Sequence, residues 1–183
     1  MSDASLPPLN LRSVIIRIIA AVAITTAIIV IGFGSSAPKV FSYMLHVKAT
    51  PHWPDLSLVA QAAPAIKIHL AVVVTALVLG AAQLLGPKGT TAHRVMGWSW
   101  VALMLTAAIS SLFIRVVNNG AFSFIHLFAV WTLIAAPLGV YFARRHKVLP
   151  HSRMMSNLFY GGLILAGVFA FLPGRLMWQM FFG

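Results

Sequence analysis

The sequence predicts an all-α fold: a polytopic transmembrane helical bundle of five helices, with a four-helix core (helices two to five) and one peripheral N-terminal helix. Of the 183 residues, 60% are hydrophobic and 8% are charged, which is too little polar surface for a soluble domain of this size. Five apolar runs are long enough to cross a membrane, which takes about 20 helical residues. Because none of them alternates like a strand, a helical bundle is favoured over a closed barrel.

The five runs predict the order of the elements along the chain. They are Leu11–Gly34, Ala65–Leu85, Val95–Val117, Phe122–Phe142 and Leu158–Phe182. Signals for helix starts stand beside the last four: Pro64 for the second helix, Thr90 or Thr91 for the third, Gly120 for the fourth and Pro150 for the fifth. Arg175 interrupts the last run, which allows the fifth helix to end early.

The predicted organisation has four parts. Residues 1–10 form a flexible cytoplasmic N-terminus, 11–34 the peripheral transmembrane helix, 35–64 an external loop with an interfacial segment, and 65–183 the four-helix core domain. Short loops within the core make consecutive helices antiparallel neighbours, so helices two and four are diagonal, as are three and five.

The basic residues predict the orientation. The net charge is +11, but the basic residues lie in short loops rather than on one soluble face, so nucleic acid is not an expected partner. Eight Lys and Arg residues fall on the side of the N-terminus and five on the other side. The positive-inside rule then predicts a multi-pass membrane protein with a cytoplasmic N-terminus and an external C-terminus.

Several kinds of chemistry are excluded by composition. The chain has no cysteine, which removes disulfides, thiolate metal sites and iron–sulfur clusters. Its only carboxylate side chains are Asp3 and Asp55, both outside the predicted spans. A paired-carboxylate active site and a carboxylate proton relay are therefore not available.

Four histidines stand out by their positions. His69, His93, His126 and His151 each lie near the start of one core helix, and the reversal of direction puts His69 and His126 at the external end and the other two at the cytoplasmic end. The spacing repeats: 57 residues separate His69 from His126, and 58 separate His93 from His151. Each pair is therefore expected to face across the bundle axis.

Two imidazoles facing each other without acidic or sulfur ligands suit a six-coordinate b-type haem. The prediction is two haems b, one for each pair. Cations near the two ends are candidates for binding the propionates: Lys67, Arg115 and Arg175 outside, and Arg94, Arg144 and Arg153 on the cytoplasmic side. Both His146 as a replacement for His151 and a purely interfacial role for all four histidines remain alternatives.

The sequence also resembles a known family. The residues concerned are His69–Leu85, AHRVMGWSWVALMLTAAISSLFI from Ala92, FSFIHLF from Phe122, HSRMM from His151 and FLPGR from Phe171. They are similar to the bacterial membrane family known as domain of unknown function 2306, and this resemblance implies a location in the bacterial inner membrane. More distantly, the chain resembles the cytochrome b561 superfamily, whose members hold two b haems in a four-helix core. That resemblance implies haem ligation by His69 with His126 and by His93 with His151, but it implies no ascorbate chemistry because no b561 substrate motif is present.

The leading hypothesis is a transmembrane di-haem cytochrome that carries electrons across the membrane as a quinone-linked oxidoreductase. Its expected partners are membrane lipid and either a quinone or quinol or a redox protein, and the external loop around His46, His52 and Trp53 is a candidate quinone site. The alternative is a non-catalytic accessory subunit of a larger membrane complex, or a homo-oligomer, with interfacial histidines. A transporter is disfavoured because the predicted spans contain no carboxylate.

Overall fold

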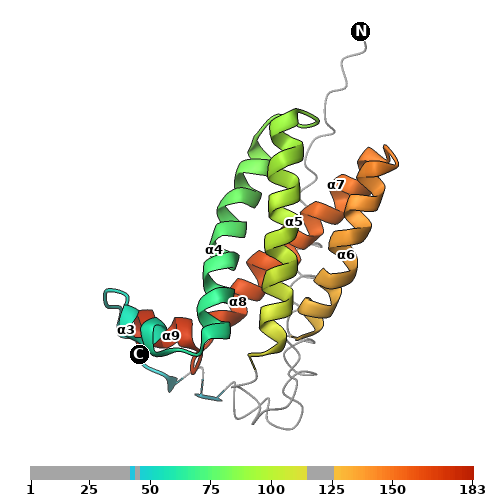
Figure 1. The fold of residues 1–183 in the computed structure, drawn as a ribbon. Coiled ribbons are helices and arrows are strands. Elements are labelled where there is room, and N and C mark those ends of the chain that lie inside the picture. The colour runs from blue at the N-terminus through green and yellow to red at the C-terminus, as the bar shows by residue number, and fades with distance from the viewer. Residues whose placement is uncertain (1–41, 44–45, 115–125) are drawn as a thin grey trace, which may run out of the picture. The chain divides into compact units, whose positions relative to one another are not determined.

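The structure is a computed structural model that describes residues 42–43, 46–114 and 126–183. The chain divides into two compact units, Met1–Val47 and Lys48–Gly183, and the second unit contains the helical bundle (Figure 1). The predicted N-terminal span Leu11–Gly34, Gly120 and the candidate propionate ligand Arg115 lie outside the described residues.

Four helical segments of the second unit are long and apolar enough to span a membrane. They are α4 (Pro64–Leu85), α5 (Thr91–Leu112), α6 (His126–Arg144) and the continuous segment Val148–Ala170, which comprises α7 (Val148–Asn157), the π-helix η3 (Leu158–Leu165) and α8 (Ala166–Ala170). Consecutive segments run antiparallel, and η3 also packs against α4 (Figure 1). The prediction of an all-helical, multi-pass membrane bundle is therefore confirmed.

The helix ends follow local chemistry. Pro64 occupies the first position of α4, where its missing N–H removes no helical hydrogen bond. Thr90 caps α5, because its side-chain oxygen accepts a hydrogen bond of 3.1 Å from the backbone N–H of His93. At the other end of α4, the Lys88 ammonium donates to the carbonyls of Gln83, Leu84 and Gly86 at 2.6, 2.7 and 2.9 Å. These contacts satisfy carbonyls that the helix itself leaves free.

The last span differs from the predicted run Leu158–Phe182. The helix begins at Val148, ten residues earlier, because the polar first turns around Pro150 and His151 are helical although they are not apolar. It ends at Ala170, and a turn with Gly174 at φ 84° leads into a separate short helix, α9 (Leu176–Phe182). Pro173 and Gly174 explain this end, since proline cannot continue a helix and glycine accepts a positive φ. The early end suggested by Arg175 is thus present, five residues before that arginine.

The centre of the bundle is an apolar core in which four spans meet. Its buried residues are Ala76, Trp100, Val101, Met104, Ala135, Ala136, Leu158, Phe159 and Leu163. Small residues let the helices approach closely. At Gly80 an added Cβ would lie 2.6 Å from both the Phe159 ring and the Trp100 indole nitrogen. Close approach at small residues is how helices pack in lipid, where apolar burial alone gives little driving force.

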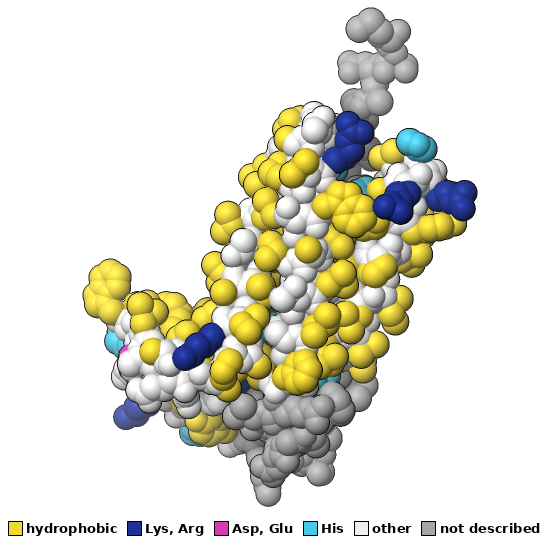
Figure 2. Space-filling model, in the orientation of Figure 1, with side chains coloured by type: hydrophobic (Ala, Val, Ile, Leu, Met, Phe, Trp, Pro, Cys, Tyr) yellow, Lys and Arg dark blue, Asp and Glu magenta, His cyan; other side chains and the backbone are white. Residues whose placement is uncertain are grey.

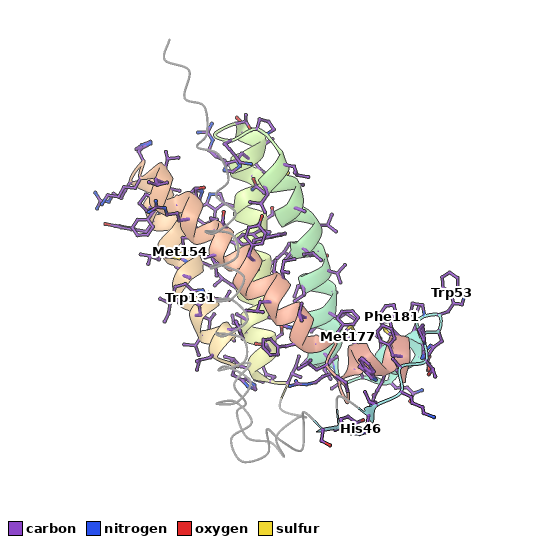
Figure 3. The ribbon with its side chains drawn as sticks, turned by 180° about the vertical axis from the view of Figure 1, so that it is seen from behind. His46, Trp53, Trp131, Met154, Met177 and Phe181 are labelled. Atoms are coloured by element: carbon purple, nitrogen blue, oxygen red, sulfur yellow. The ribbon has the colours of Figure 1, made fainter. Side chains whose placement is uncertain are left out.

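A buried hydrogen bond links α4 and α5 across this core. The Trp100 indole N–H donates to the Ala76 carbonyl at 2.9 Å. We expect Trp100→Phe to lower the free energy of unfolding by on the order of 1 kcal/mol, through loss of this bond and of ring volume. Thermal unfolding in detergent would measure the change. Trp131→Phe is the matched control, because Trp131 on α6 is 44% exposed (Figure 3) and its replacement should have little effect.

The sides of the bundle suit contact with lipid. Figure 2 shows hydrophobic side chains along the bundle, with Lys and Arg side chains gathered near its ends. Val78, Ile134 and Val168 are more than half exposed. Exposed hydroxyls are satisfied within their own helix: Thr75 donates to the Ala71 carbonyl and Thr106 to the Ala102 carbonyl.

A second, smaller feature lies at the end of the bundle where α4 begins. Asp55 caps the short helix α3 (Leu56–Gln61), and its hydrogen bonds with Ser57 lower the pKa of the Asp55 carboxyl. The backbone that precedes α3 hydrogen-bonds to the last carbonyls of α9. The N–H groups of Thr50, His52 and Asp55 donate to the carbonyls of Phe182, Phe181 and Met180, respectively. Figure 3 shows Trp53, Met177 and Phe181 at this corner, with Trp53 projecting outward.

Candidate functional site

The four histidines singled out in the sequence lie at the two ends of the bundle. His93 near the start of α5 and His151 near the start of α7 share the end that carries the α4–α5 and α6–α7 turns. His69 near the start of α4 and His126 at the start of α6 share the opposite end (Figure 1). The antiparallel order of the spans produces this division.

His69 is held by the far end of α5. Its Nδ1 lies 3.0 Å from the Ala107 carbonyl oxygen and 3.1 Å from the Ser110 hydroxyl, which itself donates to the same carbonyl at 3.0 Å. A carbonyl oxygen can only accept, so Nδ1 must carry the proton. The neutral ring then presents an unprotonated Nε2, the nitrogen that would bind a metal.

His151 has the same arrangement on α6. Its Nδ1 lies 2.9 Å from the carbonyl oxygen of Gly139 and therefore donates to it. Gly139 is buried, and an added Cβ would collide with the end of the Met155 side chain. The space left by the missing side chain at Gly139 is filled by the end of the flexible Met155 side chain, beside this contact.

His93 shares an end of the bundle with His151. Its Nδ1 is buried and has no hydrogen-bond partner among the described residues, and the same is true of the side-chain oxygen of Gln83. The Gln83 amide nitrogen donates to the His93 carbonyl at 2.9 Å, so the two side chains are neighbours.

His126 is buried, with 6% of its surface exposed, at the first described turn of α6. It lies at the same end as His69, as the sequence predicts. An imidazole buried at the end of an apolar span is costly unless it has a function or a partner.

The predicted propionate-binding cations lie near these ends with different exposures. Lys67, Arg94 and Arg153 are exposed, whereas Arg175 precedes α9 and is partly buried. Burial lowers the pKa of the Arg175 guanidinium from its ordinary value. Arg144 packs its guanidinium carbon 5.5 Å from the centre of the Trp98 ring, a cation–π contact between α6 and α5.

The other histidines have different surroundings. His146 is exposed in the turn between α6 and α7, where its φ is 55°. His52 lies between two carbonyls, with Nδ1 2.8 Å from that of Trp53 and Nε2 3.1 Å from that of Gly183. His46 belongs to the first unit, and its Nδ1 lies 2.7 Å from the Ser42 carbonyl. The contacts of His52 join the α3 segment to the C-terminus.

Three residues that matter to the site were not predicted for it: Gln83, Ser110 and Gly139. Gln83 carries a sequence signal, because it is an amide in the otherwise apolar last turns of α4. Ser110 and Gly139 carry a weaker one, since small residues occur throughout these spans. Across the described ranges, no three or more His, Cys, Asp or Glu side chains come together as a metal site.

The fold and these positions define a multi-pass helical membrane protein with histidines at both ends of its bundle. Residues 66–181 match the family model described as "Predicted membrane protein (DUF2306)", so the chain belongs to this family. The resemblance seen in the sequence is therefore confirmed for this family. Comparisons with curated proteins and with solved structures give no match.

Proposed function

We propose that the protein is a di-haem b-type cytochrome that carries electrons across a bacterial inner membrane. The observation that carries the proposal is the hydrogen bonding of the His69 and His151 rings. Both donate Nδ1–H to a backbone carbonyl of a neighbouring helix, at 3.0 and 2.9 Å. Histidines that bind metals almost always donate their other ring N–H in this way, because the hydrogen bond fixes the tautomer and the ring orientation.

The donor chemistry fits a pair of haems. His69 with His126 would hold one haem and His93 with His151 the other, each through Nε2. Bound haem would supply one-electron redox chemistry at each end of the bundle.

The chain's own residues would bind, orient and insulate the two groups. The apolar core around Trp100, Met104 and Phe159 lies between the two histidine ends and would exclude water from the space between them. Lys67 and Arg175 at one end, and Arg94 and Arg153 at the other, are the cations proposed to bind propionates. Arg144 is less suited to this role, because it packs on Trp98.

The proposed orientation follows the basic residues. The α4–α5 and α6–α7 turns, with Lys88, Arg94, Arg144 and Arg145, would face the cytoplasm, and α3 and α9 would lie on the external surface. A quinone or quinol, or a docked redox protein, is the proposed partner at one end. His52 is engaged with Trp53 and Gly183, so a quinone site in this loop would have to form beside it.

The proposal is tested by the reduced-minus-oxidised absorption spectrum of the purified full-length protein. We expect a b-type α band and a haem content near two per chain by the pyridine haemochrome assay. A protein that folds and that has been expressed with an adequate haem supply, yet shows no such band, would instead favour the accessory-subunit hypothesis.

A further inference from the structure

The cytoplasmic end contains two buried polar atoms that lack partners. They are Nδ1 of His93 and the side-chain oxygen of Gln83, and neither has a hydrogen bond among the described residues. An amide oxygen is an acceptor only, whereas an imidazole nitrogen donates when it carries the proton. The two atoms are therefore complementary.

The Gln83 side chain is already fixed beside His93. Its amide N–H donates to the His93 carbonyl at 2.9 Å, which determines which end of the amide is nitrogen. Gly97, one turn after His93 on α5, leaves room for it: a Cβ at Gly97 would lie 3.2 Å from the Gln83 amide nitrogen. The last turn of α4 thus reaches over the face of α5 that bears His93.

Two other histidines make a hydrogen bond to a neighbouring helix that His93 lacks. His69 donates Nδ1–H to Ala107 and His151 donates Nδ1–H to Gly139, each on a neighbouring helix. No equivalent carbonyl bonds to His93 among the described residues. An unpaired buried donor and an unpaired buried acceptor are both unfavourable, so side-chain rotation that joins them is favoured.

We propose that Gln83 is the positioning residue of His93: its side-chain oxygen accepts the His93 Nδ1–H and thereby fixes Nε2 as the ligand nitrogen. This inference rests on the proposed function for the identity of the group that Nε2 binds. The hydrogen bond itself does not depend on that group. Gln83 also orients the ring, because the same amide binds the backbone of the residue it positions.

The hydrogen bond can be tested in the wild-type protein. Nitrogen NMR of the full-length chain labelled with ¹⁵N-histidine, in detergent micelles and with any haem reduced, reports the tautomer of each ring. We expect His93 to carry its proton on Nδ1, that proton to resonate at low field because it is hydrogen-bonded to Gln83, and Gln83→Leu to shift it upfield. A His93 Nδ1–H signal that Gln83→Leu leaves unchanged, or a wild-type His93 protonated on Nε2, would overturn the proposal, whether or not the protein contains haem.

The positioning role is tested by two variants with opposite expected effects. Gln83→Leu removes the acceptor, which should raise the midpoint potential of one haem and weaken its binding by about 10-fold. Gln83→Glu strengthens the acceptor and should lower the potential of the same haem. A purely structural role would not give shifts of opposite sign at a single haem.

The control lies at the other end of the bundle. Ser110→Ala removes a hydroxyl beside His69 and should change only the other haem. Wild-type potentials for both haems in both Gln83 variants would overturn the positioning role and leave the cytochrome proposal standing. A folded wild-type protein without haem would instead overturn the cytochrome proposal, and the tautomer of His93 would still decide the role of Gln83.

Discussion

Gly139→Ala is expected to weaken one of the two proposed haem signals and leave the other. The new methyl group would collide with the end of the Met155 side chain and lie 3.4 Å from Cγ of Met154, both on α7. The flexible Met155 side chain must then leave the space beside Gly139, and such overpacking typically costs about 1–3 kcal/mol. Repacking at this point disturbs the 2.9 Å contact between His151 Nδ1 and the Gly139 carbonyl. The haem proposed at His151 should therefore bind less tightly or become high-spin.

Gly161→Ala and Gly167→Ala are the matched controls. Both glycines lie in the same span as His151, and an added Cβ at either would meet nothing within 4 Å. Both variants should keep two haems and the wild-type absorption spectrum. Haem content, low-spin EPR signals and thermal unfolding measured on the three variants check the prediction. If Gly139→Ala kept both low-spin signals, the close approach of α6 and α7 would not position His151.

The spans could be predicted because lipid imposes a strong compositional rule. The predicted run Ala65–Leu85 differs from α4 by one residue, and Pro64 and Thr90 mark helix starts through chemistry that depends only on neighbouring residues. The third run, Val95–Val117, begins four residues late, because the first turn of α5 contains His93 and Arg94. Polar first turns extend beyond the apolar run they belong to.

The last span illustrates the limit of hydropathy. Leu158–Phe182 contains apolar residues of two separate helices, and hydropathy does not separate them across the turn at Gly174. Neither does it indicate the π-helix Leu158–Leu165, which depends on the packing of this segment against α4 and α6. Such π-segments are often found at functional sites, and this one begins seven residues after His151.

The histidine positions were predictable, but their hydrogen bonds were not. Helix starts and antiparallel order place His93 and His151 at one end of the bundle, where the structure also has them. Their contacts with Gln83 and Gly139 depend on the rotation and separation of adjacent helices, which residue spacing does not determine. The tautomers of His69 and His151 follow from such contacts, so they required coordinates.

Loss of haem should be pairwise in histidine variants, which is the strongest test of the site. His93→Ala and His151→Ala should each abolish the same haem, and the double variant should lose no more than either one. His69→Ala and His126→Ala should abolish the other haem. Combining His93→Ala with His69→Ala should remove both, because these residues lie at opposite ends of the bundle. Six-coordinate ligation requires both members of a pair, so effects within a pair cannot add.

Low-spin EPR signals and haem content distinguish this outcome from general destabilisation. His146→Ala is the control, because His146 is exposed in the α6–α7 turn, five residues before His151, and should keep both haems. A double variant of His93 and His151 that lost both haems would contradict the pairing, as would loss of different haems in the two single variants. Non-additivity at each end, combined with additivity between ends, is an outcome that interfacial histidines without a shared ligand would not produce.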